Sequence, residues 1–210
     1  MKYVFEFIGT FFLVLTIGMA VIGPQGAGAL APLAIAAALT AMIYAGGHVS
    51  GAHYNPAVSF GVFLRGKLSM KDMFVYWLAQ IMGAVLAAFV VIFFKGGVGE
   101  VAAQVDLAKI VAGEFLFTFA LVLVVLQVAT SKRTAGNSYF GLAIGLVIVT
   151  GAYSVGPISG GAFNPAVSVA AVVLNLMDVK ILWVYVVGQL VAAGLSALVF
   201  RLNEPAEMNR

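Results

Sequence analysis

The chain lacks cysteine altogether and contains few charged residues. Without cysteine, its 210 residues can form no disulfide, thiolate metal site or cysteine nucleophile. Charged residues make up 9% and hydrophobic residues 63%, and the mean hydropathy is +1.10, whereas soluble domains average about 25% charged and about 45–50% apolar residues. The composition therefore predicts an integral membrane protein in a lipid bilayer. Its apolar runs favour helical spans over strands of alternating polarity.

Six apolar runs approach the roughly 20 residues with which a helix crosses a bilayer. We expect these spans at about 3–22, 27–46, 73–94, 110–129, 139–156 and 181–200. Two shorter segments, about 55–64 and 164–175, each begin at Asn-Pro, the pattern of an N-cap followed by proline at the first helical position. They are too short to cross and are predicted to be re-entrant half-helices.

The two half-helix segments belong to an internal repeat. Ser50–Ser59 and Ser159–Ser168 are nearly identical and stand 109 residues apart. The same offset relates Tyr76–Gln80 to Tyr185–Gln189, and the Glu6 segment is echoed at Glu114. We therefore expect one domain, 1–210, with repeats at about 1–95 and 108–203. Because each repeat holds an odd number of spans, the second is predicted to be inverted. The echo also favours a first span that belongs to the fold rather than to a signal peptide.

Lysine and arginine are distributed unequally between the two predicted sides. With the N-terminus inside, eight lie in the cytoplasm, namely Lys2, Arg65, Lys67, Lys71, Lys132, Arg133, Arg201 and Arg210, and three lie outside, namely Lys95, Lys109 and Lys180. This bias predicts that both termini are cytoplasmic, in a plasma or inner membrane. The net charge of +3 is then explained by topology, and no nucleic-acid partner is expected.

Paired half-helices would build a polar path through an apolar wall. Their N-termini place unpaired N–H groups and positive dipole ends near the membrane centre, where cations are repelled. Neutral solutes could exchange water for the amides of Asn55 and Asn164 and for backbone carbonyls. The expected carbonyls are those of Gly51, Ala52, His53, Gly160, Gly161 and Ala162.

With two Asn-Pro-Ala motifs, each after Ser-Gly, and with Glu6 and Glu114 in matching spans, the chain resembles the major intrinsic protein family of aquaporins and aquaglyceroporins. The resemblance covers nearly the whole chain. It implies a channel for water and small neutral solutes, a homotetramer with one pore per subunit, and no cofactor or metal. The implied pore residues are Asn55, Pro56, Ala57, Asn164, Pro165 and Ala166, and the implied loop braces are Glu6, Glu114, Gln80 and Gln189.

The resemblance also implies a four-residue selectivity filter near the outer mouth, formed here by Ile35, Ala152, Gly161 and Val167. These residues depart from the family pattern, in which arginine usually stands at the Val167 position. Water-selective members usually have an aromatic residue at Ile35 and histidine at Ala152. A filter of Ile, Ala, Gly and Val offers no side-chain donor, so glycerol, urea or ammonia become candidate solutes beside water. The short loops are closer to those of water channels.

Other functions are open at this stage. An ion-coupled transporter would reuse inverted repeats but normally needs a coupling site at the midplane, and Glu6 and Glu114 are carboxyl groups within spans. A closed-pore structural membrane protein is the third alternative. His48 and His53 suggest a metal site only weakly, because no cysteine or third histidine accompanies them. No nucleophile–base arrangement favours an enzyme.

Overall fold

The computed structural model describes residues 1–23, 25–101 and 106–207 of the chain. Within these residues the fold is helical and contains no strand. Six helical segments are long and apolar enough to cross a membrane: Lys2–Val21, Gly28–Ser50, Met70–Lys95, Leu107–Thr130, Phe140–Ser159 and Val179–Asn203. The all-α membrane fold predicted from the sequence is confirmed. Arg210, which the charge count includes, lies outside the described residues.

In chain order the helices are α1 (Lys2–Val21), α2 (Ala31–Ser50), α3 (Pro56–Leu64), α4 (Met70–Lys95), α5 (Leu107–Val125), α6 (Phe140–Ser159), α7 (Pro165–Val173) and α8 (Leu182–Asn203). Short 3-10 turns are η1 (Gly28–Leu30), η3 (Lys132–Thr134), η4 (Val179–Ile181) and η5 (Pro205–Glu207), and a π-helical turn, η2 (Leu126–Thr130), continues α5. With nine residues each, α3 and α7 span only about 14 Å, half of a hydrocarbon core about 30 Å thick.

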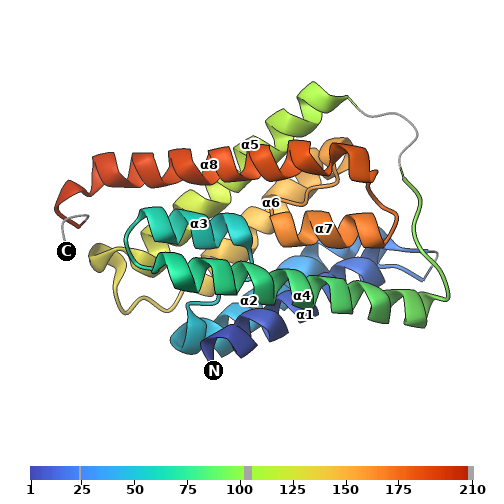
Figure 1. Ribbon diagram of the computed structural model, residues 1–210, viewed down its shortest axis with the longest axis horizontal. Helices are drawn as coiled ribbons and strands as arrows, with labels where there is room; N and C mark the ends of the chain where they lie inside the picture. Colours follow the sequence, from blue (N-terminus) through green and yellow to red (C-terminus); the bar gives the residue numbers. More distant parts are fainter. Residues whose placement is uncertain (24, 102–105, 208–210) are drawn as a thin grey trace.

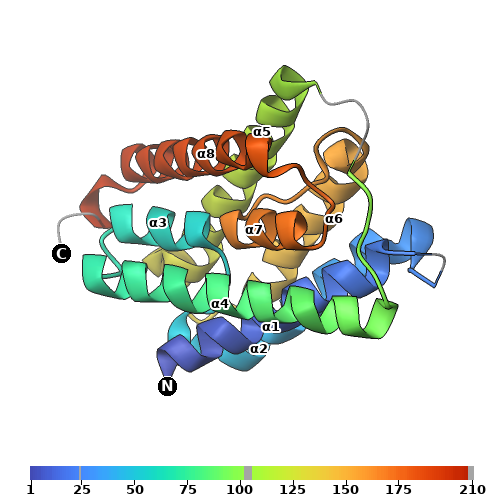
Figure 2. The same cartoon turned by 45° about the vertical axis from the view of Figure 1, so that its right-hand side comes forward.

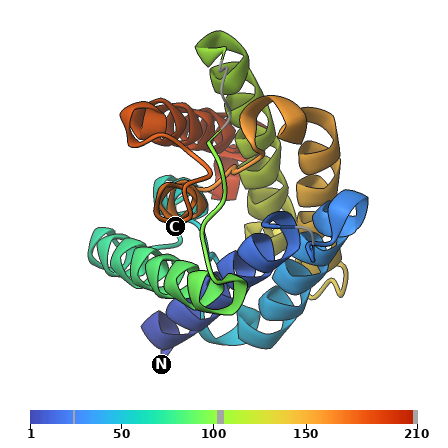
Figure 3. The same cartoon turned by 90° about the vertical axis from the view of Figure 1, so that its right-hand side faces the viewer.

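The two short helices lie end to end inside the bundle, with their N-termini meeting near its middle (Figures 1 and 2). The six long helices surround them, as the view along the bundle shows (Figure 3). α1 begins and α8 ends at the same end of the bundle, which we call the terminal side; the opposite end is the distal side (Figure 1). α3 runs from the middle to the terminal side, and α7 runs from the middle to the distal side.

α2 and α6 continue past the ends predicted at 46 and 156, to Ser50 and Ser159. The predicted ends fell at the glycines of these segments, but glycine is tolerated inside a well-packed helix. The helices end instead at Gly51 and Gly160, whose φ angles of 86° and 82° give left-handed C-caps. The same residues turn the chain back into the bundle, so these caps determine where each re-entrant segment begins.

Small residues allow the long helices to approach closely. In α4, Ala84, Ala87 and Ala88 are fully buried, and a Cβ atom at Gly83 would overlap the backbone of Phe7 in α1. A larger residue at this contact would push α1 away from α4. Close packing of this kind is the main attraction between helices in lipid, where burial of apolar surface gives little advantage.

Candidate pore and selectivity filter

Each half-helix begins at an asparagine that caps its own N-terminus. Asn55 has extended backbone with φ of −157°, and its Oδ1 atom accepts a hydrogen bond from the Ala57 amide at 2.8 Å. Asn164 has φ of −158° and accepts from the Ala166 amide at 2.9 Å. The following prolines occupy the first helical position, where the missing N–H leaves no bond unmade.

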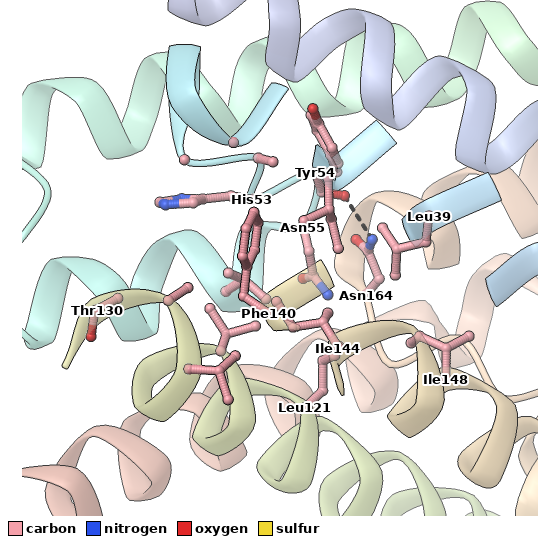
Figure 4. A pocket seen from close by; sticks show the side chains of 18 of the residues that line it. Leu39, His53, Tyr54, Asn55, Leu121, Thr130, Phe140, Ile144, Ile148 and Asn164 are labelled. Atoms are coloured by element: carbon pink, nitrogen blue, oxygen red, sulfur yellow. Dashed lines mark hydrogen bonds between the residues drawn. The ribbon is translucent and has the colours of Figure 1, made fainter. Parts of the chain in front are cut away.

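The same asparagines join the two half-helices. Asn55 Nδ2 donates to the Phe163 carbonyl and Asn164 Nδ2 donates to the Tyr54 carbonyl, each at 2.9 Å, the latter drawn in Figure 4. Tyr54 and Phe163 hold φ angles of 50° and 48°, a left-handed conformation that is strained by about 1 kcal/mol or more. Both asparagines line the terminal cavity described below, so the second amide hydrogen of each is available to a molecule there.

Glu6 of α1 ties the first re-entrant segment to the bundle. The side chain is fully buried, and its Oε1 atom accepts from the Ser50 hydroxyl at 2.6 Å and the His53 amide at 2.9 Å. Its Oε2 atom accepts from the Tyr54 amide at 2.7 Å and from Gln80 Nε2 at 2.8 Å. Four hydrogen bonds therefore satisfy a carboxyl group that has been removed from water.

Glu114 of α5 makes the equivalent contacts in the second half. It is also fully buried, and its Oε1 atom accepts from the Ser159 hydroxyl at 2.8 Å and the Ala162 amide at 3.0 Å. Its Oε2 atom accepts from the Phe163 amide at 2.7 Å and from Gln189 Nε2 at 2.8 Å. Each re-entrant segment is thus held by one carboxyl group from the first helix of its half.

The glutamines extend this network to the half-helices. Gln80 Nε2 also donates to Ser59 Oγ at 3.0 Å, and Ser59 Oγ donates to the Asn55 carbonyl at 3.1 Å. The second half repeats these contacts with Gln189, Ser168 and Asn164, both at 3.1 Å. A continuous chain of hydrogen bonds therefore runs from each glutamate to the asparagine at the centre.

A cavity of about 510 Å³ leads from the two asparagines toward the terminal side. Leu39, Leu121, Ile144 and Ile148 form an apolar wall (Figure 4), opposite the re-entrant backbone. His48 and residues 131–132 and 134–137 line its mouth. Of the six predicted carbonyl residues, five line this terminal cavity: Gly51, Ala52, His53, Gly161 and Ala162.

A second cavity, of about 350 Å³, lies on the distal side. It is lined by the sixth carbonyl residue, Gly160, and again by Gly161 and Ala162. All four predicted filter residues are here: Ala152 lines this distal cavity, whereas Ile35, Gly161 and Val167 line both cavities. The structure therefore brings the four positions together where the terminal and distal cavities meet, and only aliphatic side chains and glycine surround that point.

Several contacts at the site escaped the sequence prediction. The hydroxyls of Tyr76 and Tyr185 donate to the Ser50 and Ser159 carbonyls at 2.7 and 2.6 Å, although the sequence marked these tyrosines only as parts of a repeat. His53 Nδ1 lies 3.1 Å from Ser59 Oγ, a contact that fixes the histidine in its loop. Their signal was the shared 109-residue offset, which the hydroxyl donors follow and His53 does not.

The fold and the two re-entrant segments define a membrane channel, and comparisons with known proteins identify its family. Residues 1–200 match the sequence profile of the major intrinsic protein family. The chain is 32% identical to aquaporin TIP2-3 of Arabidopsis thaliana over 214 residues, which cover 94% of this chain and 85% of the relative. It is 35% identical to aquaporin NIP1-4 of Oryza sativa subsp. japonica over 206 residues, covering 94% and 74%.

A solved structure agrees with these sequence relationships. The X-ray structure of the aquaglyceroporin from Plasmodium falciparum superposes with a TM-score of 0.74 and 25% identity, over 97% of this chain and 94% of that one. The chain therefore belongs to the major intrinsic protein family. It is an integral membrane protein of the aquaporin type, a channel for water or small solutes, and the predicted resemblance is confirmed.

Proposed function

We propose that the protein is a passive channel that conducts water together with small uncharged solutes such as glycerol, urea or ammonia, and that it has no enzymatic activity. The observation that carries this proposal is the composition of the meeting point between the two cavities. Ile35, Ala152, Gly161 and Val167 line it, and none of them has a side-chain donor or a charge. In our proposal these four residues form the selectivity filter.

An aliphatic filter changes the balance between solutes. An arginine would add bulk and a charged donor fork, which favours water and excludes wider molecules. Val167 is only 8% exposed and adds neither, while the carbonyls of Gly161 and Ala162 remain as acceptors. A small solute with N–H or O–H groups can therefore pass if it donates to carbonyls on one side and contacts aliphatic groups on the other.

Ion exclusion must then depend on the centre of the pore. The N-termini of α3 and α7 meet there, and Asn55 and Asn164 present their free amide hydrogens to the cavity. Two positive helix ends and two donors repel cations and orient water. We assign pore-lining roles to the two Asn-Pro-Ala motifs on this basis and bracing roles to Glu6, Glu114, Gln80 and Gln189.

The surroundings of the channel follow from the sequence. The lysine and arginine bias favours a cytoplasmic location for the terminal side, and we propose a plasma or inner membrane as the site of action. Membership of the family favours a homotetramer with one pore per subunit. The repeat boundaries, about 1–95 and 108–203, are supported by the matching hydrogen-bond networks of Glu6 and Glu114.

Stopped-flow light scattering of proteoliposomes tests this function. Vesicles containing the protein should relax faster than protein-free vesicles in gradients of water, glycerol, urea and ammonia, without saturation and without an ion gradient. Flux that saturates or requires an ion gradient would identify a coupled transporter instead. Vesicles that relax no faster than protein-free ones would show a closed pore.

A further inference from the structure

One buried ion pair lies outside the pore network. Arg65, the C-cap residue of α3, is 1% exposed, and its Nη2 atom contacts Glu207 Oε2 at 2.5 Å. Its Nη1 atom donates to the Glu207 carbonyl at 2.9 Å, and its guanidinium lies 4.6 Å from the centre of the Phe200 ring. Arg65 Nε has no partner within the described residues. The buried charge of Arg65 therefore depends on Glu207.

Glu207 also holds the segment that lines the mouth of the terminal cavity. Its Oε1 atom accepts from the Ser131 hydroxyl at 3.1 Å and from the Lys132 amide at 3.0 Å. We call residues 131–137 the mouth loop, because all but Arg133 in this range line the cavity mouth. One carboxyl group thus joins the end of α3, the tail after α8 and the mouth loop.

The mouth loop is also bonded to the π-helical turn before it. A π turn leaves carbonyls without their usual helical partners, and the loop supplies substitutes. Thr134 Oγ1 donates to the Gln127 carbonyl at 2.6 Å, and Asn137 Nδ2 donates to the Val128 carbonyl at 2.7 Å. Arg65 Nη2 reaches the Thr130 carbonyl at 3.3 Å. In this position the loop forms the side of the cavity and leaves its mouth open.

We propose that Arg65 and Glu207 form a clamp that holds the mouth loop beside the pore, and that release of the clamp lets the loop cover the mouth and lowers permeability. This gating role rests on the proposed channel function. The clamp couples the loop directly to α3, whose other end is Asn55, so the tail and the pore centre are connected through one short helix.

Glu207→Gln tests the clamp, because it keeps the size of the side chain and removes its charge. We expect water permeability per reconstituted protein to fall at least about threefold. Trypsin should also cleave after Lys132 and Arg133 at least about fivefold faster, because cleavage requires local opening of the loop. Glu204→Gln is the matched control, since its ion pair at 3.2 Å is with Arg133, whose side chain is 76% exposed. It should change neither measurement.

A second variant avoids a misfolded protein as an explanation. Arg65→Leu/Glu207→Leu leaves no buried charge unpaired, and it should fold yet show the same loss of permeability and the same faster cleavage. Unchanged permeability in both variants overturns the proposal, as does a loss of permeability without faster cleavage. Wild-type vesicles that relax no faster than protein-free vesicles would reject the channel function itself, and with it the gating role.

Discussion

Arg65 ends α3 and Leu174 ends α7, at equivalent positions 109 residues apart in the two halves. Both side chains are 1% exposed. In each half the segment after the third long helix covers the end of the other half's short helix. After α4, the Gly99 amide donates to the Leu174 carbonyl at 2.8 Å, whereas after α8 the cover is the ion pair between Arg65 and Glu207.

The comparison separates what both halves need from what only one has. Both need the hydrogen-bond network of the glutamate, glutamine and asparagine, and its geometry is nearly the same twice. Only the terminal half has a buried charge at the end of its short helix, and only its cavity mouth is lined by polar groups such as His48 and Thr134. The shared part maintains the pore, and the unshared parts are where selectivity and regulation can differ between the two sides.

Leu174→Arg should have the largest effect, because it copies the charge without its partner. A buried and unpaired guanidinium destabilises by about 3–5 kcal/mol, so we expect a large fall in the thermal unfolding midpoint in detergent. Arg65→Leu/Glu207→Leu is the reciprocal change and should alter stability by less than about 2 kcal/mol, since apolar replacement of a whole ion pair is often neutral. Equal destabilisation by the two changes would contradict the comparison.

Glu6→Gln and Glu114→Gln test whether the shared networks are equivalent. Each replacement removes a charged acceptor and introduces a second donor among groups that already donate, which should destabilise by about 3 kcal/mol. We expect the two losses to agree within about 1 kcal/mol when unfolding is followed by circular dichroism. Gln80→Glu serves as a control of opposite sign, because it adds a carboxylate beside Glu6 and should be worse than either. A large difference between the two glutamates would show that the halves are supported differently.

Much of this architecture could be predicted from the sequence, because the repeat carries its own information. The pairing of Asn55 with Asn164 and of Glu6 with Glu114 followed from one offset, and a Pro after each Asn indicated where the short helices begin. The ends of α2 and α6 were predicted too early, because glycine inside a helix and glycine at a C-cap look alike until the φ angle is known. The π turn at Leu126–Thr130 has no sequence signal of its own.

Val167→Arg and Val58→Arg compare equivalent positions, again 109 residues apart, on the two sides of the pore centre. Val167 lines the meeting point of the cavities, whereas Val58 lines only the terminal cavity. We expect Val167→Arg to lower glycerol and urea permeability about tenfold and water permeability less than about threefold, because bulk at the filter excludes the wider solutes first. Stopped-flow light scattering measures both.

Val58→Arg should lower the permeability of all solutes by similar factors, since it obstructs a wider part of the path. Val167→Leu controls for size without charge and should fall between wild type and Val167→Arg. If Val167→Arg reduced glycerol and water permeability by equal factors, Val167 would not belong to the filter.

The sequence could not predict the clamp. Arg65 contributed to the prediction only as one cytoplasmic charge in a count, and Glu207 stood in a short polar tail that was expected to be solvated. Their contact joins residues 142 positions apart, and no repeat or spacing connects them. A buried ion pair between distant segments depends on how the helices pack, so only the folded structure brings it out.

The smallest predicted effect is a pH dependence that only the terminal side should show. Burial raises the pKa of Glu207, but hydrogen bonds from Lys132 and Ser131 and the charges of Arg65 and Lys132 outweigh it, so the pKa lies below its usual 4.5. Stabilisation from a carboxyl group with a depressed pKa is fully present above the usual value and is lost as pH falls through the lower, folded-state value. The clamp should therefore be intact at neutral pH and weaken only below about pH 4.5.

Water permeability of wild-type proteoliposomes should accordingly be constant between about pH 7 and pH 5 and fall less than about twofold by pH 4. Acidifying the distal side alone should have no effect. The groups around Glu207 are the cations Arg65, Lys132 and Arg133 and the carboxyl group of Glu204. Glu204→Gln should therefore keep the acid response, and Glu207→Gln should lose it. A response that persists in Glu207→Gln, or one that begins between pH 7 and pH 6, would assign the titration to another group such as His48 at the mouth.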